Sequence, residues 1–221
     1  MQRDADLQLI NEEFYAESVT PEQLDMLLAD GWRHFGTHFF RYNLGMYHDE
    51  IRRVQPLRIR VADLKLSKSQ RRVLRKNSDL NIKIHPINIT DEIYELFERH
   101  KARFKTGVPQ SIYDFLSLDA ANRPAKGLEI SARLNDNLVA ASFFDVGKTS
   151  VSSVYGIFEL AASSRSLGIF TMLKEIDYAI ENAKQYYYPG YAYEGESFYD
   201  YKKRFTATEV FDWNGNWTSQ S

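Results

Sequence analysis

Hydrophobic residues follow two periods along the chain, and the changes of period predict its helices and strands. In "TPEQLDMLLADGW" Thr20 can cap a helix, Pro21 suits its first position, and leucines recur at helical spacing until Gly31. In "PLRIRVADL" apolar residues instead alternate with Arg58 and Arg60, as in a half-buried strand. The two patterns predict helices that begin after Thr20, Ser67 and Thr90 and within 163–168, short helices near 111–118 and 199–205, and strands over 32–42, 56–64, 81–89, 127–158 (three antiparallel strands), 186–193 and 209–213.

This order of elements predicts the fold class. Several antiparallel strands, then a helix and a further strand, predict an α/β (α+β) chain with a mixed, mostly antiparallel sheet flanked by helices. We expect an N-terminal region over 1–90 and a core over 91–221, or one continuous domain. The polar stretch 43–55 is expected to be a loop.

Composition excludes several kinds of site. The 221 residues include no cysteine, which excludes disulfides, thiolate metal sites and a cysteine nucleophile. Residues 1–20 are polar and acidic without an apolar signal core. No run of about 18 apolar residues occurs, so we expect no membrane-spanning segment. The lack of cysteines fits a reducing compartment, and the expected location is cytoplasmic.

Charge is unevenly distributed along the chain. Between Arg52 and Lys76 there are ten Lys or Arg residues against Asp63 alone. Because this stretch has a net charge of +9 and the whole chain has one of −2, the remaining residues have a net charge of −11. A basic strip on an acidic protein is typical of a localised polyanion site, although a solvated helix face has the same composition. The helix predicted after Ser67 directs four of these side chains outward: Arg71, Arg72, Arg75 and Lys76.

The stretch "SSRSLGIFTML", residues 163–173, places an Arg and a Gly just ahead of a helical apolar pattern. A helix start leaves backbone N–H groups unpaired and carries a partial positive charge, so it attracts anions. Gly168 allows close approach of a ligand, and Arg165 adds a charged fork of donors. The turn therefore predicts a phosphate site, with an ordinary helix start as the alternative.

Five motifs in a fixed order carry a resemblance to one family. The motifs are Ser69-Gln70-Arg71-Arg72, Val154-Tyr155, Arg165-Ser166-Leu167-Gly168, Gly190-Tyr191, and Asp200-Tyr201-Lys202 followed by Phe205. Together they resemble the aminoacyl-tRNA–protein transferases, meaning the arginyl and bacterial leucyl transferases. The resemblance extends from Leu24 to Trp217 and includes "LLADGWRHFGTHFFR".

The resemblance implies a GNAT-like fold and the transfer of Arg or Leu from charged tRNA to the N-terminus of an acceptor protein. The implied partners are aminoacyl-tRNA and the acceptor N-terminus, and we expect no cofactor, no DNA and no membrane partner. The residues implied in aminoacyl-tRNA binding are Arg165, Ser166, Leu167, Gly168, Arg71, Arg72, Arg75 and Lys76. Those implied at the reaction site are Tyr155, Tyr191 and Lys202. With no Ser–His–Asp set and no thiol, we expect direct transfer without a covalent enzyme intermediate, and the general base is unassigned.

The chain departs from the family at its cysteines. The family carries them in an N-terminal segment and after the first aromatic strand, where they can bind a metal or an iron–sulfur centre. Here the second stretch reads "RYNLGMYHDEIRRVQPLRI", and the N-terminal cysteine segment is missing, so we expect neither a cluster nor a metal. His34 and His38 share one face of the predicted strand, but no carboxylate is clearly placed beside them. His100 is expected on a helix surface.

Two other functions stay open. An acyl-CoA N-acyltransferase on the same fold would favour a small residue where Phe170 stands. A non-catalytic tRNA- or protein-binding relative would have lost activity with its cysteines. Seven tyrosines fall within 186–201, and they can serve as packing or as a stacking platform for a base, with Tyr191 the best platform candidate.

Overall fold

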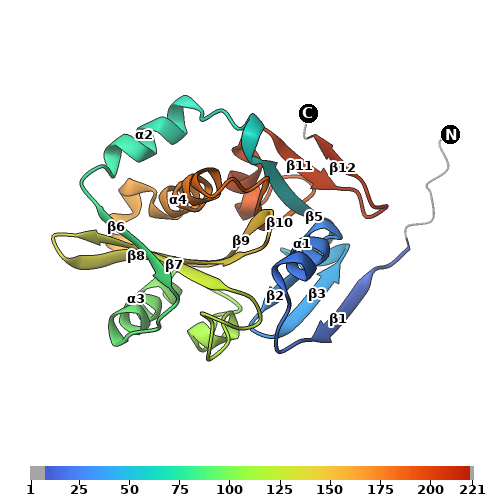
Figure 1. The fold of residues 1–221 in the computed structure, drawn as a ribbon, viewed down its shortest axis with the longest axis horizontal. Coiled ribbons are helices and arrows are strands. Elements are labelled where there is room, and N and C mark those ends of the chain that lie inside the picture. The colour runs from blue at the N-terminus through green and yellow to red at the C-terminus, as the bar shows by residue number, and fades with distance from the viewer. Residues whose placement is uncertain (1–7, 220–221) are drawn as a thin grey trace.

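In the computed structural model, which describes residues 8–219, helices pack around one large sheet, and a small second sheet lies beside it (Figure 1). The large sheet has nine strands in the order β12-β11-β5-β10-β9-β8-β7-β6, with β4 paired to β5. Its strand pairs are antiparallel except for β9 and β10, which run parallel. The expected fold class, a mixed, mostly antiparallel sheet flanked by helices, is confirmed.

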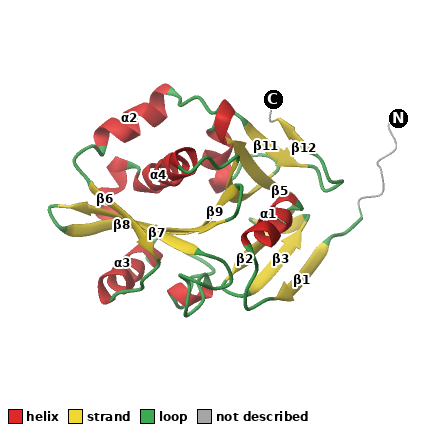
Figure 2. Cartoon of the chain, viewed as in Figure 1, coloured by secondary structure: helices red, strands yellow, loops and turns green. Residues whose placement is uncertain are grey.

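Figure 2 distinguishes the helices, strands and loops of the chain. The strands of the large sheet are β4 (Leu44–Tyr47), β5 (Glu50–Arg60), β6 (Asn81–Pro86), β7 (Gly127–Leu134), β8 (Asn137–Val146), β9 (Ser150–Phe158), β10 (Tyr186–Tyr193), β11 (Thr208–Phe211) and β12 (Trp217–Ser219). The small sheet has β1 (Asn11–Tyr15), β2 (Arg33–Phe35) and β3 (His38–Tyr42) in the order β1-β3-β2. The helices are α1 (Pro21–Ala29), α2 (Lys68–Lys76), α3 (Asp91–Lys101) and α4 (Leu167–Glu181), with short 3-10 turns η1 (Val61–Asp63), η2 (Ile112–Asp114), η3 (Leu160–Arg165) and η4 (Phe198–Arg204).

The core is divided by the large sheet into two layers. Successive side chains of a strand point to opposite faces, and on β8 Phe143 packs with α3 while Phe144 packs with α4. Both phenylalanines are fully buried. Figure 1 shows the same arrangement, with α2 and α4 on one side of the sheet and α3 on the other. These two apolar layers hold α4 against the sheet, and the candidate site lies beside the start of α4.

Local sequence signals place the helix starts as expected. Thr20 and Gln23 form a capping box at α1, and Ser67 and Gln70 form another at α2. The outward direction of the four basic side chains on α2 is also confirmed, because all four are exposed.

The expectation that 43–55 is a loop is wrong. This stretch forms the hairpin of β4 and β5, joined by His48 and Asp49, which both have positive φ angles. The hairpin was missed because its two turn residues, His48 and Asp49, are not the Asn-Gly or Asp-Gly pair that usually marks such a turn. Beyond the hairpin, β5 continues to Arg60 and pairs with β10 on one side and with β11 on the other.

The boundary expected between 90 and 91 stays a prediction. Three strands from the first region, β4, β5 and β6, belong to the same sheet as the strands of the second. Within residues 8–219, no helix combines the length and the apolar character needed to cross a bilayer.

Candidate active site

The candidate site is a cavity of about 410 Å³ where β9 and β10 separate. The two strands pair in parallel only as far as Ser152 and Tyr188. The next residue of β10 is Pro189, which has no N–H group to continue the ladder. Gly190 follows with a φ of +100°, a conformation that favours glycine. The strands therefore diverge at this point, and the cavity occupies the space between them.

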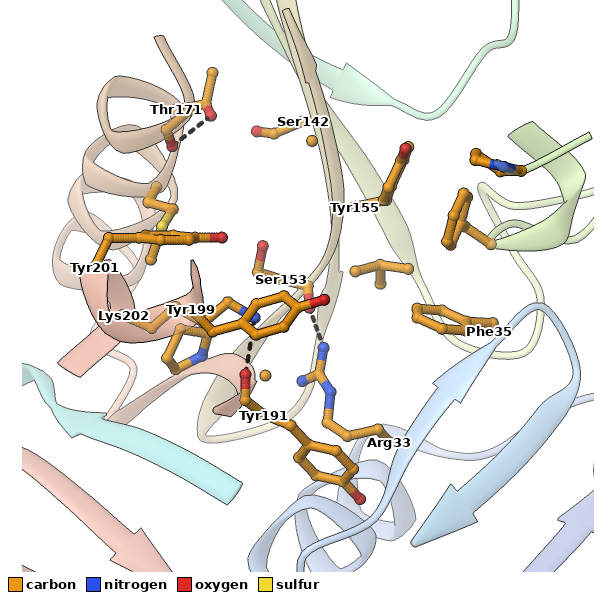
Figure 3. A pocket seen from close by; sticks show the side chains of 18 of the residues that line it. Arg33, Phe35, Ser142, Ser153, Tyr155, Thr171, Tyr191, Tyr199, Tyr201 and Lys202 are labelled. Atoms are coloured by element: carbon orange, nitrogen blue, oxygen red, sulfur yellow. Dashed lines mark hydrogen bonds between the residues drawn. The ribbon is translucent and has the colours of Figure 1, made fainter. Parts of the chain in front are cut away.

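Several elements contribute side chains to this cavity (Figure 3). They are Arg33 and Phe35 of β2, Phe40 of β3, Ser142 of β8, Ser153, Val154 and Tyr155 of β9, Gly168, Thr171 and Glu175 of α4, Tyr191 of β10, and Tyr199, Tyr201 and Lys202 of η4, together with Phe115 and Pro109 from the loops around η2. Part of the lining is apolar, with Phe35, Phe115 and Val154, while Arg33, Lys202 and Glu175 bring charged or titratable groups to the cavity.

The structure brings together only part of the residues that the sequence predicted. Tyr155, Tyr191, Lys202 and Gly168 line this one cavity, although they come from four different elements. The basic residues of α2 lie outside it. So do three residues of the predicted phosphate turn: Arg165, Ser166 and Leu167.

Tyr155 carries a hydroxyl group without a partner. Its OH is buried, and no protein group within residues 8–219 hydrogen-bonds to it. The ring stacks on Phe115 with 3.8 Å between ring centroids, which fixes its direction. Burial raises the pKa of Tyr155 to about 12, so the hydroxyl stays protonated at neutral pH. It can therefore donate a hydrogen bond to a ligand in the cavity.

Tyr191 has a different role from Tyr155. Its hydroxyl donates to the carbonyl oxygen of Gly31 at 2.6 Å, and burial raises the pKa of the phenol. Figure 3 shows the ring directed away from Lys202. What Tyr191 offers near Lys202 is its backbone carbonyl, which accepts a hydrogen bond from the ammonium group at 3.1 Å. Its use as a stacking platform stays a prediction.

Lys202 and Arg33 place two cationic groups in the same part of the cavity. Burial, reinforced by the charge of Arg33, lowers the pKa of Lys202 to about 7. The Arg33 side chain donates through Nη1 to Ser152 Oγ at 2.8 Å and through Nη2 to the carbonyl oxygen of Ser153. Within residues 8–219, no carboxylate lies within 4.0 Å of either cation.

Glu175 is a buried carboxyl group on the face of α4 that lines the cavity. It is completely buried, and its desolvation raises the pKa of Glu175 to about 7. Oε2 accepts a hydrogen bond from the Tyr187 hydroxyl at 2.7 Å, whereas Oε1 has no partner. Ser142 Oγ, which lines the same cavity, is also without a partner. Buried polar atoms are normally hydrogen-bonded, so these atoms are available to a ligand that enters the cavity.

Sequence reasoning missed Arg33, Glu175 and Ser142. A signal for Glu175 was present, since it interrupts the apolar stripe of α4 between Met172 and Ile176. A charged residue at a core position of a helix is costly unless it has a function or a partner. Arg33 and Ser142 gave no comparable signal, because their surroundings are set by residues distant in the sequence.

The start of α4 lies against the cavity through Gly168. The helix has no side-chain cap, and its first three N–H groups have no acceptor within the helix. A β-carbon at Gly168 would lie 3.2 Å from Phe158 Cε1, so a larger residue would crowd this wall. Arg165 instead turns toward the end of α2, where it forms a two-pronged pair with Asp79, each contact 2.8 Å long.

The histidines do not form a metal site in the part of the chain that the structure describes, which holds no group of three or more His, Cys, Asp or Glu with metal-binding geometry. His34 is buried on β2, where its Nε2 lies 2.7 Å from Asp145, while His38 belongs to β3 and pairs with Glu13. The expectation that His100 lies on a helix surface is wrong. It is completely buried, because α3 turns this residue toward β9.

The chain is similar in sequence to one family of transferases. A family described as "Arginine-tRNA-protein transferase, C terminus" matches residues 92–212, and its N-terminal counterpart matches residues 3–72. An aspartate/glutamate leucyltransferase of Helicobacter hepaticus is 30% identical over 202 residues, covering 89% of this chain and 82% of its own. A second one, from Pseudoalteromonas atlantica, is 30% identical over 193 residues and covers 85% and 80%.

One solved structure extends the comparison to the fold. The crystal structure of FemX superposes with a TM-score of 0.51 at 11% identity, covering 88% of this chain and 68% of that one. At this identity the likeness concerns the fold alone.

Proposed function

Because the chain belongs to the arginine-tRNA–protein transferase family, we propose that it transfers leucine from charged tRNA to acceptor proteins that begin with Asp or Glu. The choice of leucine and of acidic acceptors is supported by the names of its relatives from Helicobacter hepaticus and Pseudoalteromonas atlantica. The apolar part of the cavity lining supports leucine as well, since Phe35, Phe115 and Val154 suit an apolar side chain. We propose the cytoplasm, where charged tRNA occurs, as the location.

The observation that carries the mechanism is the pair of unpartnered polar atoms in one cavity, Tyr155 OH and Glu175 Oε1. An aminoacyl ester is already activated, so the enzyme must align the acceptor amine, remove its proton and stabilise the oxyanion. The protonated phenol of Tyr155 can donate a hydrogen bond to the oxyanion. The Glu175 carboxyl group, with a pKa of about 7, can accept the proton of the amine, because an N-terminal amine has a pKa of roughly 8.

The reaction then proceeds in two steps. The amine nitrogen attacks the ester carbonyl carbon, a C–N bond forms, and Tyr155 donates a hydrogen bond to the oxygen that becomes negative. Glu175 takes the proton from the nitrogen. The bond from the carbonyl carbon to the ribose oxygen breaks, and the proton passes to that oxygen as it leaves. No covalent bond to the enzyme is needed.

The tRNA is proposed to approach along α2. Several contacts join the end of this helix to the turn before α4. Among them are Lys76 Nζ to the Ser164 carbonyl at 2.6 Å, Asn77 Nδ2 to the Arg165 carbonyl at 2.9 Å, and the pair of Arg165 with Asp79. These contacts connect the exposed basic face with the start of α4. Phosphates held on α2 would therefore place the charged 3′ end near Gly168 and the cavity.

The test is to mix the protein with tRNA charged with leucine or arginine and with peptides that begin with Asp or Glu, and to identify any added residue by mass. We expect leucine to be added, and addition to stop when the tRNA is digested beforehand. A parallel reaction with acetyl-CoA tests the N-acyltransferase alternative. Addition of an acetyl group, or no addition from any charged tRNA, would overturn the proposal.

A further inference from the structure

Two cations, the buried Arg33 and the half-buried Lys202, face the same small space in the cavity. Arg33 is only 8% exposed. A β-carbon built on Gly190 would lie 3.1 Å from Lys202 Nζ and 3.6 Å from Arg33 Nη2. Both charged groups therefore border one point, which the absent side chain of Gly190 leaves open. Figure 3 shows the two side chains reaching into the same part of the cavity, near Ser153 and Tyr191.

No carboxylate within residues 8–219 forms an ion pair with Arg33 or Lys202, although Asp145 and Glu175 lie near enough for their charge to act on Arg33. The hydrogen bonds of both side chains go to neutral acceptors, namely a serine hydroxyl and two backbone carbonyls. Asp145 is already paired with His34 at 2.7 Å, and Glu175 accepts a hydrogen bond from Tyr187. Like charges buried together without a counter-ion are costly, and such a pair is stabilised when an anion binds between them.

We propose that Arg33 and Lys202 bind the side-chain carboxylate of the acceptor's first residue, and that they select acidic acceptors. The inference rests on the proposed function and deepens it by assigning the residues that recognise the acceptor. A carboxylate offers two oxygens, one for each cation. The cavity that both cations border, about 410 Å³ in volume, has room for such a group.

Burial favours a carboxylate over an RNA phosphate at this position. Phosphates lie on the outside of a nucleic acid, and exposed Lys and Arg side chains are the usual contacts to them. The chain has such side chains on α2. The pair at Gly190 lies inside the cavity instead, where a short side chain of a peptide can reach it. A neutral Asn or Gln would leave both charges without compensation.

The first experiment compares peptides that differ only in the first residue, Asp against Asn and Glu against Gln. The quantity measured is kcat/KM for leucine transfer from charged tRNA. We expect the wild type to prefer the acidic peptide by about tenfold or more, the scale of a missing charged hydrogen bond. The substitution Lys202→Met should bring this ratio close to one, and Lys202→Arg should restore it.

The control variant is Lys203→Met, in the same short helix. Lys203 is paired with Asp200 at 3.1 Å, outside the cavity lining, and its replacement should leave the ratio unchanged. If Lys202 acted only as a proton acceptor, Lys202→Met would slow both peptides by the same factor and preserve the ratio. That outcome would overturn the assignment.

A second measurement separates this inference from the proposed function. Binding of the same peptides is followed by calorimetry without tRNA. Tighter binding of the Asp peptide, abolished in Lys202→Met, supports the anion site even if no leucine is transferred, in which case the proposed function fails. Transfer of leucine without any preference between Asp and Asn, or with a preference that Lys202→Met leaves intact, overturns the inference and leaves the function standing.

Discussion

At the scale of single residues, the buried polar atoms carry most of the functional information. Four buried side-chain atoms within residues 8–219 lack a hydrogen-bond partner: His100 Nε2, Ser142 Oγ, Tyr155 OH and Glu175 Oε1. Three of the four belong to residues that line the cavity. His100 lies just behind it, with its ring centroid 6.4 Å from that of Tyr155. A protein tolerates such unsatisfied groups where a ligand or a reaction requires them.

Replacing Tyr155 by Phe tests this idea directly. Because the hydroxyl has no protein partner within residues 8–219, Tyr155→Phe should leave the unfolding midpoint unchanged or slightly raised. The removal of an oxyanion donor should lower kcat about a hundredfold. Tyr191→Phe is the matched control, since its hydroxyl is bound to Gly31. It should cost about 1 kcal/mol of stability and have the smaller effect on kcat. The reverse pattern would contradict the role given to Tyr155.

His100 gives a prediction for stability against pH. Burial, reinforced by the charge of Arg103, lowers the pKa of His100 from 6.5 to about 4. The folded state therefore holds a neutral imidazole, while the unfolded state binds a proton below pH 6.5. The contribution of His100 is complete above pH 6.5 and is lost as the pH falls to about 4, at up to about 1.4 kcal/mol for each pH unit.

The measurement is urea unfolding of the wild type and His100→Leu between pH 4 and pH 7. Carboxyl groups titrate in both proteins, so the difference between the two curves isolates the histidine. We expect the variant to lose less stability than the wild type as the pH falls. Parallel curves would indicate that His100 is charged in the folded state.

At the scale of elements, the sequence predicts best what neighbouring residues determine. The caps at Thr20 and Ser67 were predictable because each capping box involves residues only three positions apart. The hairpin of β4 and β5 was missed although its pairing is local, because its turn residues His48 and Asp49 do not carry the usual Asn-Gly or Asp-Gly signal. At the site the limit is distance along the chain. Tyr155 and Lys202 were found through motifs, whereas the surroundings of Arg33 depend on Ser153, 120 residues away.

The turn before α4 can be assigned by comparing two variants. Arg165 forms an ion pair with Asp79 in the structure. Removing the Arg165 side chain therefore breaks this ion pair, and it also removes any contact that Arg165 makes to a tRNA phosphate. If Arg165 binds tRNA, Arg165→Ala should weaken tRNA affinity about ten- to a hundredfold, while Asp79→Ala should leave it equal or stronger. If Arg165 contributes only through its ion pair with Asp79, both variants should weaken tRNA binding and lower the melting temperature by similar amounts. Filter binding and thermal melts distinguish the two cases.

At the scale of the whole molecule, charge is separated between an acidic body and one basic helix. The chain as a whole has a net charge of −2, and α2 presents Arg71, Arg72 and Arg75 to solvent. Arg72 and Arg75 form no ion pair with residues 8–219, and Arg71 donates only to the carbonyl oxygen of Leu66. The remainder of the protein is negatively charged and repels the negatively charged tRNA. The basic face of α2 therefore both orients the tRNA and limits where it can bind.

The variant with Arg71, Arg72 and Arg75 all replaced by Ala tests this orientation. The fold should tolerate it, because these side chains lie in solvent, and thermal melts check that it does. The affinity for tRNA should fall, and the slope of log affinity against log salt should decrease by about 0.7–0.9 for each phosphate that the protein no longer binds. Arg99→Ala combined with Lys101→Ala removes two charges from α3, where both are paired with glutamates, and should leave the slope unchanged. If the two multiple variants change the slope equally, RNA binds through overall charge, and the basic face of α2 does not orient the tRNA.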